Sequence, residues 1–190
     1  LDRVHFPVSS IMHAALALEG PRQVIPTIAQ CKLAQNSQFF LHQFFELFEA
    51  LNTQEIHFVA ASGRQYSSIQ DKLMAIHHEI TIIAENGGYI KQGEAEIGSI
   101  HLSPDHINKL IPELRKVDDI YIVLCGRKSA YIETDDEKFK NILREYYTKF
   151  DVVEDLLSNV HDDFFKVAVY HFVSSETYIY PHVKHFKNEL

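Results

Sequence analysis

The amino-acid sequence predicts an α/β protein in which a partial, mostly parallel sheet is followed by a smaller α+β unit. Two short apolar runs, residues 56–61 and 80–85, have the length and continuity of strands that are buried on both faces. Helical periodicity occurs before and between them, in residues 39–51 and 65–78. Because strands alternating with helices are typical of a doubly wound parallel sheet, we expect the two strands to be parallel neighbours.

The pattern changes after Gly88, and the second half of the chain predicts an open sheet with two helices on one face. We expect the order β-α-β-β-α-β, formed by strand 97–102, helix 104–116, strands 119–125 and 129–134, helix 136–150 and strand 164–172. Ser103 followed by Pro104 is the usual start of a helix, since serine caps it and proline fits its first position.

These patterns place a domain boundary near residue 90. We expect a partial core domain in residues 1–90, whose first 38 residues are atypical because they lack clean periodicity, and a second domain in residues 91–190. The sequence leaves the oligomeric state of the protein open.

Composition and charge describe an acidic protein with a packed core. Of the 190 residues, 46% are apolar, and the net charge is −8. The negative charge argues against a nucleic-acid partner, because surfaces that bind the phosphate backbone are basic. No apolar run has the length of a membrane span, and Cys31 and Cys125 do not form a CxxC pair. We therefore expect a cytoplasmic protein without a membrane partner.

Small polar residues follow both strands of the predicted core, as Ser62-Gly63-Arg64 and as Asn86-Gly87-Gly88. In an open parallel sheet, ligands bind at the carboxyl ends of the strands. The seryl hydroxyl, the backbone amides and the dipole of the following helix are suited to holding an anionic oxygen there. Ordinary turn chemistry is the alternative, since turns use the same residue types. The candidate phosphate-binding residues are Ser62, Gly63, Arg64, Asn86 and Gly87.

Several segments resemble the haloacid dehalogenase superfamily in its Cof-type sugar-phosphatase branch. FVAASGRQY (58–66) followed by IIAENGGYI (82–90) is similar to the second motif and the next strand of that branch. VLCGRKSAYIE (123–133), YYTKFDVVEDL (146–156) and DDFFKVAV (162–169) are similar, in order and spacing, to its type IIB cap domain. The resemblance covers about residues 39–172.

The resemblance implies a Rossmann-like core, a cap that closes over the site, and Mg²⁺-dependent hydrolysis of small phosphorylated metabolites such as sugar phosphates. Such enzymes form an aspartyl-phosphate on one aspartate, and a second aspartate two residues later acts as general acid and base. A serine or threonine holds the phosphoryl group, and Ser62 matches that position. In the cap, Ser129, Tyr131 and Lys166 are candidates for contacts with the substrate, although a solvent-facing strand lysine is the alternative for Lys166.

The sequence departs from the family pattern at the catalytic aspartates. Counting back from the first helix puts Thr27 and Ala29 at their positions, and Asp2 is the only aspartate in residues 1–60. The lysine and the GDxxND metal motif that follow the cap in the family are also missing, so the expected Mg²⁺ lacks its ligands in this chain.

We therefore predict a phosphatase scaffold that is inactive as the chain stands. The alternative is a non-catalytic module that binds a metabolite or a partner. The sequence leaves open whether the chain is a gene fragment, a frameshifted or decayed product, or one half of a split protein.

Overall fold

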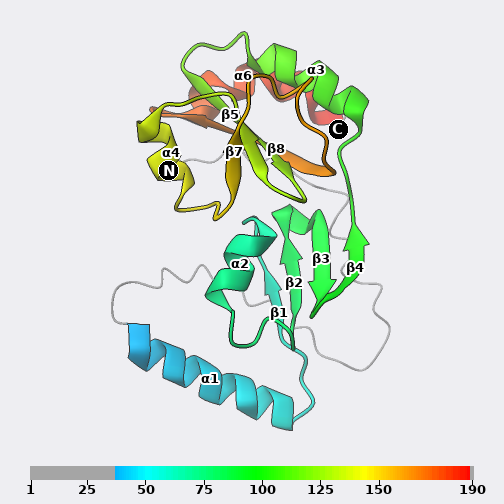
Figure 1. The fold of residues 1–190 in the computed structure, drawn as a ribbon, viewed down its shortest axis with the longest axis vertical. Helices are drawn as coiled ribbons and strands as arrows, with labels where there is room; N and C mark the ends of the chain where they lie inside the picture. Colours follow the sequence, from blue (N-terminus) through cyan, green and yellow to red (C-terminus); the bar gives the residue numbers. More distant parts are fainter. Residues whose placement is uncertain (1–36, 189–190) are drawn as a thin grey trace. The chain divides into compact units, whose positions relative to one another are not determined.

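The computed structural model describes residues 37–188, which form an N-terminal unit, residues 37–99, and a C-terminal unit, residues 100–188 (Figure 1). The sequence predicted a boundary near residue 90, which lies inside strand β3 (Tyr89–Gln92). The observed boundary comes later, between Ser99 and Ile100. The chain does not leave the first sheet at residue 90, because β3 and the next strand, β4 (Ala95–Ser99), both pair within it.

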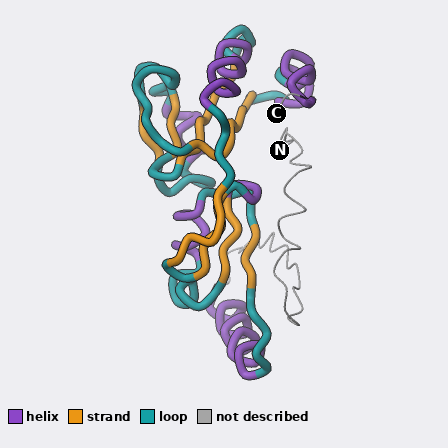
Figure 2. The backbone as a smooth tube through the Cα atoms, turned by 90° about the vertical axis from the view of Figure 1, so that its right-hand side faces the viewer, coloured by secondary structure: helices purple, strands orange, loops and turns teal. Residues whose placement is uncertain are grey.

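The N-terminal sheet has the strand order β1-β2-β3-β4. β1 (Val59–Ala61) and β2 (Thr81–Ala84) are parallel, which confirms that the two apolar runs are parallel neighbours. β3 and β4 are antiparallel to their neighbours, so the sheet is mixed. The strands of the described chain fall into two separate groups, one in each unit (Figure 2).

Two helices, α1 (Ser37–Thr53) and α2 (Tyr66–Lys72), contribute to the core on one face of this sheet. Phe48 of α1 and Ile69 of α2 belong to one buried cluster with Ile82 of β2. Phe48 is 2% exposed and Ile82 is 1% exposed. Phe48 therefore joins α1 to the core of this unit.

The C-terminal sheet has the strand order β7-β6-β5-β8. The unit contains, in chain order, α3 (Pro104–Leu114), β5 (Ile120–Gly126), β6 (Ala130–Ile132), α4 (Glu137–Leu143), β7 (Phe150–Val152), β8 (Phe164–His171), α5 (Ser175–Tyr178), α6 (Tyr180–Val183) and the 3-10 helix η3 (Lys184–Asn188). β5 pairs antiparallel with β6, as the hairpin pattern predicts, and with β8. Within residues 37–188, every helix is too short or too polar to serve as a membrane span.

The order of elements in this unit is α-β-β-α-β-β before the last helices, and not the expected β-α-β-β-α-β. The strand predicted over residues 97–102 is displaced to β4, which belongs to the other sheet. The helix predicted over residues 136–150 ends at Leu143, and the chain then turns into β7, which pairs in parallel with β6.

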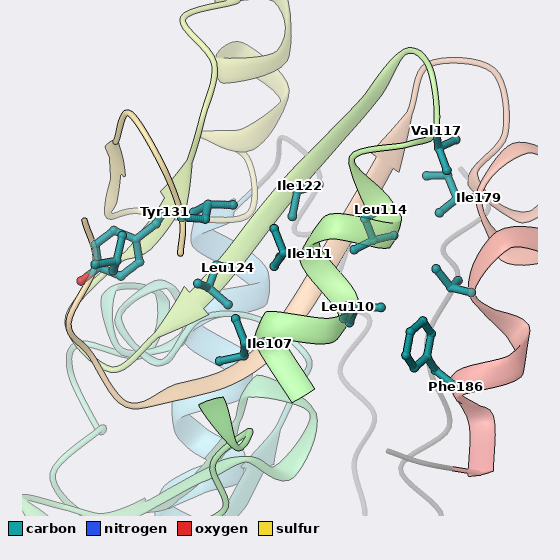
Figure 3. Close-up of a cluster of buried hydrophobic side chains, with 13 residues drawn as sticks. Ile107, Leu110, Ile111, Leu114, Val117, Ile122, Leu124, Tyr131, Ile179 and Phe186 are labelled. Carbon is teal, nitrogen blue, oxygen red and sulfur yellow. The ribbon is translucent and has the colours of Figure 1, made fainter. Parts of the chain in front are cut away.

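Helices cover both faces of the C-terminal sheet, whereas the sequence predicted two helices on one face. Successive residues of a strand point to opposite faces. In β5, Leu124 packs in a cluster with Ile111 of α3 and with Ile179, as Figure 3 shows. Its neighbour Cys125 packs in a second cluster with Phe139 of α4. The apolar residues of α4 therefore bury the face that α3 leaves open.

The start of α3 agrees with the sequence prediction. The Ser103 hydroxyl oxygen accepts a hydrogen bond from the His106 amide at 3.1 Å, and Pro104 occupies the first helical position. Asp105 lies in the first turn, where a negative charge interacts favourably with the helix dipole. These local signals fix where the helix begins.

A charged network joins the end of α3 to the loop after β7. Arg115 Nη2 donates to Asp155 Oδ1 at 2.5 Å, and Arg115 Nε donates to Glu133 Oε2 at 3.2 Å. Asp155 also accepts hydrogen bonds from the hydroxyl and the amide of Ser158. The Ser158 hydroxyl, and after it the Arg115 guanidinium, hold the pKa of Asp155 well below its usual range.

The variant Asp155→Asn is expected to be less stable than the wild type at neutral pH, with a smaller difference in acid. The pKa of Asp155 is lower in the folded chain than in the unfolded chain. Its carboxylate therefore stabilises the fold above about pH 4, and this contribution is lost as the pH falls towards the folded pKa. Urea midpoints at neutral pH and at about pH 3 measure the difference. Asp151→Asn on β7 is the control, and an equal gap at both pH values would contradict the prediction.

Candidate functional site

The structure brings together the two strand ends that the sequence singles out. The Ser62 amide donates to the Ile83 carbonyl at 2.9 Å, and the Glu85 amide donates to the Arg64 carbonyl at 3.0 Å. A β-carbon built on Gly63 would lie 2.2 Å from Asn86 Oδ1. The turn after β1 and the turn after β2 are therefore in direct contact at the carboxyl ends of two parallel strands.

Part of this sequence pattern is turn chemistry. Glu85, Asn86 and Gly87 have φ values of 52°, 58° and 96°, which lie in the left-handed region. Glycine and asparagine adopt this region at low cost, whereas glutamate does so rarely. The turn reading, which the sequence left as an alternative, thus explains why Asn86 and Gly87 stand at the end of β2.

Ser62 closes the turn after β1 with its own side chain, as serine often does in turns. Its Oγ accepts a hydrogen bond from the Arg64 amide at 3.2 Å, and the side chain is half-buried. A hydroxyl that accepts one bond still has a proton to donate. The Arg64 amide fixes the position of the oxygen, so the hydroxyl proton is available to an anionic oxygen bound beside the turn.

The backbone contributes less to this site than the sequence suggested. The amides of Ser62 and Arg64 already donate within the protein, to Ile83 and to Ser62 Oγ. The helix predicted over residues 65–78 is reduced to α2, which has seven residues, so its dipole adds little. The Ser62 hydroxyl is therefore the principal donor that the described turn offers, with the half-buried Arg64 on the same turn.

Two tyrosines lie beside the strand ends and were not among the predicted site residues. The rings of Tyr66, at the start of α2, and Tyr89, at the start of β3, meet edge to face with centroids 5.4 Å apart. Lys91 Nζ lies 5.1 Å from the Tyr66 ring centroid, and burial raises the pKa of Tyr66. The sequence offered little sign that Tyr89 lies beside the site, because its strand, β3, has no apolar run.

The three substrate-contact candidates of the C-terminal unit do not share one site. Ser129 is 1% exposed, and its hydroxyl donates to the Ala130 carbonyl at 3.2 Å. Tyr131 is 9% exposed, and its hydroxyl donates to Asp162 Oδ2 at 3.0 Å. Burial, and after it this hydrogen bond, raise the pKa of Tyr131 far above its usual range. Both hydroxyls therefore donate hydrogen bonds within the protein, at the hairpin formed by β5 and β6.

Lys166 lies on the other face of the same sheet. It is the β8 partner of Cys125, whereas Tyr131 is the β6 partner of Leu124, and neighbouring residues of β5 point to opposite faces. Lys166 is half-buried, with its Nζ 5.7 Å from the centroid of the Tyr147 ring. A contact between Lys166 and Tyr131 on one ligand is therefore excluded by the pairing of the strands.

The residues of the described chain do not fit a Mg²⁺ site. In residues 37–188, no group of three His, Cys, Asp or Glu side chains is arranged to hold a metal ion. The adjacent acids Asp162 and Asp163 are engaged elsewhere: Asp162 accepts from the Lys128 and Asp163 amides and from Tyr131, and Asp163 pairs with Arg127. Thr27 and Ala29, at the predicted aspartate positions, lie outside the described residues.

Solved structures with the same fold define the class as a mixed α/β protein with a partial Rossmann-like sheet. SMU.1108c from Streptococcus mutans UA159 is 21% identical with a TM-score of 0.63, covering 68% of this chain and 49% of that one. A haloacid dehalogenase-like hydrolase from B. subtilis is 10% identical with a TM-score of 0.62, covering 75% of this chain and 59% of that one.

The sequence itself assigns the family. The sequence model of the haloacid dehalogenase-like hydrolases matches residues 33–190, so the chain belongs to this family, as its resemblance to the Cof-type branch predicted. It is also similar to the 5-amino-6-(5-phospho-D-ribitylamino)uracil phosphatase YbjI of Escherichia coli (strain K12), with 29% identity over 138 residues. That match covers 72% of this chain and 51% of the relative, so the chain spans about half of the relative's length.

Proposed function

We propose that the chain recognises small phosphorylated metabolites through the Ser62 turn and does not hydrolyse them by itself. The observation that carries this proposal is the Ser62 hydroxyl, which the Arg64 amide orients at 3.2 Å at the end of a parallel strand pair. Membership of the haloacid dehalogenase-like hydrolases supports a phosphate ester as the ligand. The name of the E. coli relative makes phosphorylated ribityl compounds the first metabolites to test, beside sugar phosphates.

The chemistry that the turn offers is binding. The Ser62 hydroxyl donates one hydrogen bond to a phosphoryl oxygen, and charged acceptors make such bonds shorter and stronger than neutral ones. Hydrolysis in this family needs a carboxylate nucleophile and a second aspartate two residues later, and the 190 residues contain no Asp-x-Asp sequence. Losing both groups costs many orders of magnitude in rate.

The expected result is phosphate binding that depends on the Ser62 hydroxyl. Ser62→Ala removes the donor and should weaken the binding of inorganic phosphate and of glucose 6-phosphate about tenfold, which is the worth of one such hydrogen bond. Ser62→Thr keeps the hydroxyl and is the matched control. Amide chemical shifts of the ¹⁵N-labelled full chain, followed during titration, measure both affinities.

The same samples test the second half of the proposal. With Mg²⁺ and p-nitrophenyl phosphate, the wild type and Ser62→Ala should both release phosphate at the buffer rate. Mg²⁺-dependent turnover by the wild type that Ser62→Ala lacks would refute the absence of hydrolysis. A wild-type chain with no affinity for any phosphate ester would refute the binding function.

A further inference from the structure

We infer that Asn86 is a positioning residue, which holds the turn of Ser62, Gly63 and Arg64 in the conformation that orients the Ser62 hydroxyl. The sequence placed Asn86 among the residues that contact phosphate. The contacts of its half-buried side chain assign it a different part, against the neighbouring turn. The inference rests on the proposed function only in taking Ser62 as the phosphate-binding residue. The contact between Asn86 and Gly63 is a property of the fold.

The Asn86 side chain fills the space next to Gly63. If Gly63 had a β-carbon, the three nearest atoms would all belong to Asn86: Oδ1 at 2.2 Å, Cγ at 3.3 Å and Nδ2 at 3.8 Å. Real atoms do not approach to 2.2 Å, so a β-carbon at position 63 would displace the end of the Asn86 side chain. The end of β2 therefore packs directly against the backbone of the turn after β1.

The backbone around Asn86 holds this side chain in place. Asn86 is left-handed, with a φ of 58° and a ψ of 29°. Asparagine and glycine are the residues that accept this conformation most readily. On one side, the Glu85 amide donates to the Arg64 carbonyl at 3.0 Å, and on the other, the Gly88 amide donates to the Glu85 carbonyl at 3.1 Å. The side chain is thus aimed at Gly63 from an anchored turn.

Gly63 lies inside the ring that orients Ser62. The hydrogen bond from the Arg64 amide to Ser62 Oγ, at 3.2 Å, joins the residues on either side of Gly63. A displacement of Gly63 relative to Ser62 and Arg64 changes the distance between these two neighbours. By limiting where Gly63 can move, Asn86 maintains this hydrogen bond and with it the direction of the Ser62 proton.

Three variants of the full chain test the inference. Asn86→Gly keeps the left-handed conformation and removes the side chain. Gly63→Ala adds the β-carbon that meets Asn86. The double variant combines both changes, so that the new β-carbon meets no Asn86 atom. The measurements are hydrogen exchange at the Arg64 amide, urea midpoints of the four proteins, and the affinity for inorganic phosphate.

In Asn86→Gly, the Arg64 amide should exchange about tenfold faster and phosphate should bind about tenfold more weakly, as expected for the loss of one hydrogen bond. The amides of α3 are the internal control and should be unchanged. Gly63→Ala should lower the urea midpoint in the wild-type background, where the Asn86 side chain must move aside, and less in the Asn86→Gly background. This non-additivity measures the contact directly.

Two results would overturn the inference: wild-type exchange at Arg64 in Asn86→Gly, or an equal effect of Gly63→Ala in both backgrounds. A purely structural contribution of Asn86 would lower the midpoint without changing the exchange at Arg64 relative to its neighbours, and this outcome also counts against positioning. If the wild type binds no phosphate, the proposed function fails, whereas the exchange and the urea midpoints still decide the part of Asn86.

Discussion

Asp162→Ala is expected to destabilise the C-terminal unit by about 3 kcal/mol, since hydrogen bonds to a charged acceptor are each worth about 1.5–3 kcal/mol. Asp162 Oδ2 accepts from the Lys128 amide at 2.8 Å and from the Tyr131 hydroxyl at 3.0 Å. The variant leaves the hydroxyl of Tyr131, a residue only 9% exposed, without its acceptor. The Asp162 carboxylate also occupies the space next to Gly126, where a β-carbon would lie 2.3 Å from Oδ2.

Asp163→Ala is the matched control for this prediction. Asp163 is the next residue, and its side chain, which is 55% exposed, pairs with Arg127 at 3.0 Å. Exposed ion pairs contribute about 1 kcal/mol or less, so this variant should remain close to the wild type. Urea unfolding, combined with hydrogen exchange in β5 and β6, measures both variants. Equal losses for the two aspartates would show that Asp162 does not hold the hairpin.

Phe139→Ala is expected to cost about 3–5 kcal/mol of unfolding free energy, the usual range for a fully buried phenylalanine. Phe139 is 1% exposed. Its ring stacks on Tyr121 with centroids 4.3 Å apart, and it packs against Tyr170 with centroids 5.7 Å apart. Alanine would leave a cavity between α4 and the sheet that the surrounding strands cannot fill by a small shift.

Tyr180→Ala is the control for the loss of an aromatic side chain, because Tyr180 is 38% exposed. Its effect should be smaller than that of Phe139→Ala, since more than a third of its surface is already in water and less burial is lost. Both variants are compared by their urea midpoints and slopes. A small effect of Phe139→Ala would mean that α4 does not pack on the sheet and that this face of β5 is open.

The parallel pair and its polar ends could be predicted because each carries a strong local signal. Residues 56–61 and 80–85 are continuous apolar runs, and the small polar residues after them mark where each strand ends. β3 was missed, and β4 was predicted too late in the chain and in the wrong unit. Both strands are largely polar or exposed and contain Lys91, Gln92 and Glu96, so neither shows an apolar run or clean alternation. The boundary between the units was predicted about ten residues too early for the same reason, since the strands that extend the first sheet gave no clear signal.

The site was less predictable than the fold, because residue types do not reveal partners that are distant in the sequence. Ser62 could be found from its place after a strand. Tyr131 was a candidate for a substrate contact, but its hydroxyl donates a hydrogen bond to Asp162, 31 residues further along the chain. The contact between Gly63 and Asn86 joins two turns whose proximity depends on the pairing of β1 with β2. The sequence predicted that the two turns meet and could not predict which atoms touch.

β5 separates two hydrophobic clusters, and this arrangement governs how the C-terminal unit loses its structure. Leu124 belongs to the cluster with α3, and Cys125 belongs to the cluster with α4. Because both clusters pack on β5, the loss of β5 removes the support of both. Denaturation of residues 100–188 should accordingly be a single cooperative transition, so that far-ultraviolet and tyrosine signals change at one denaturant concentration.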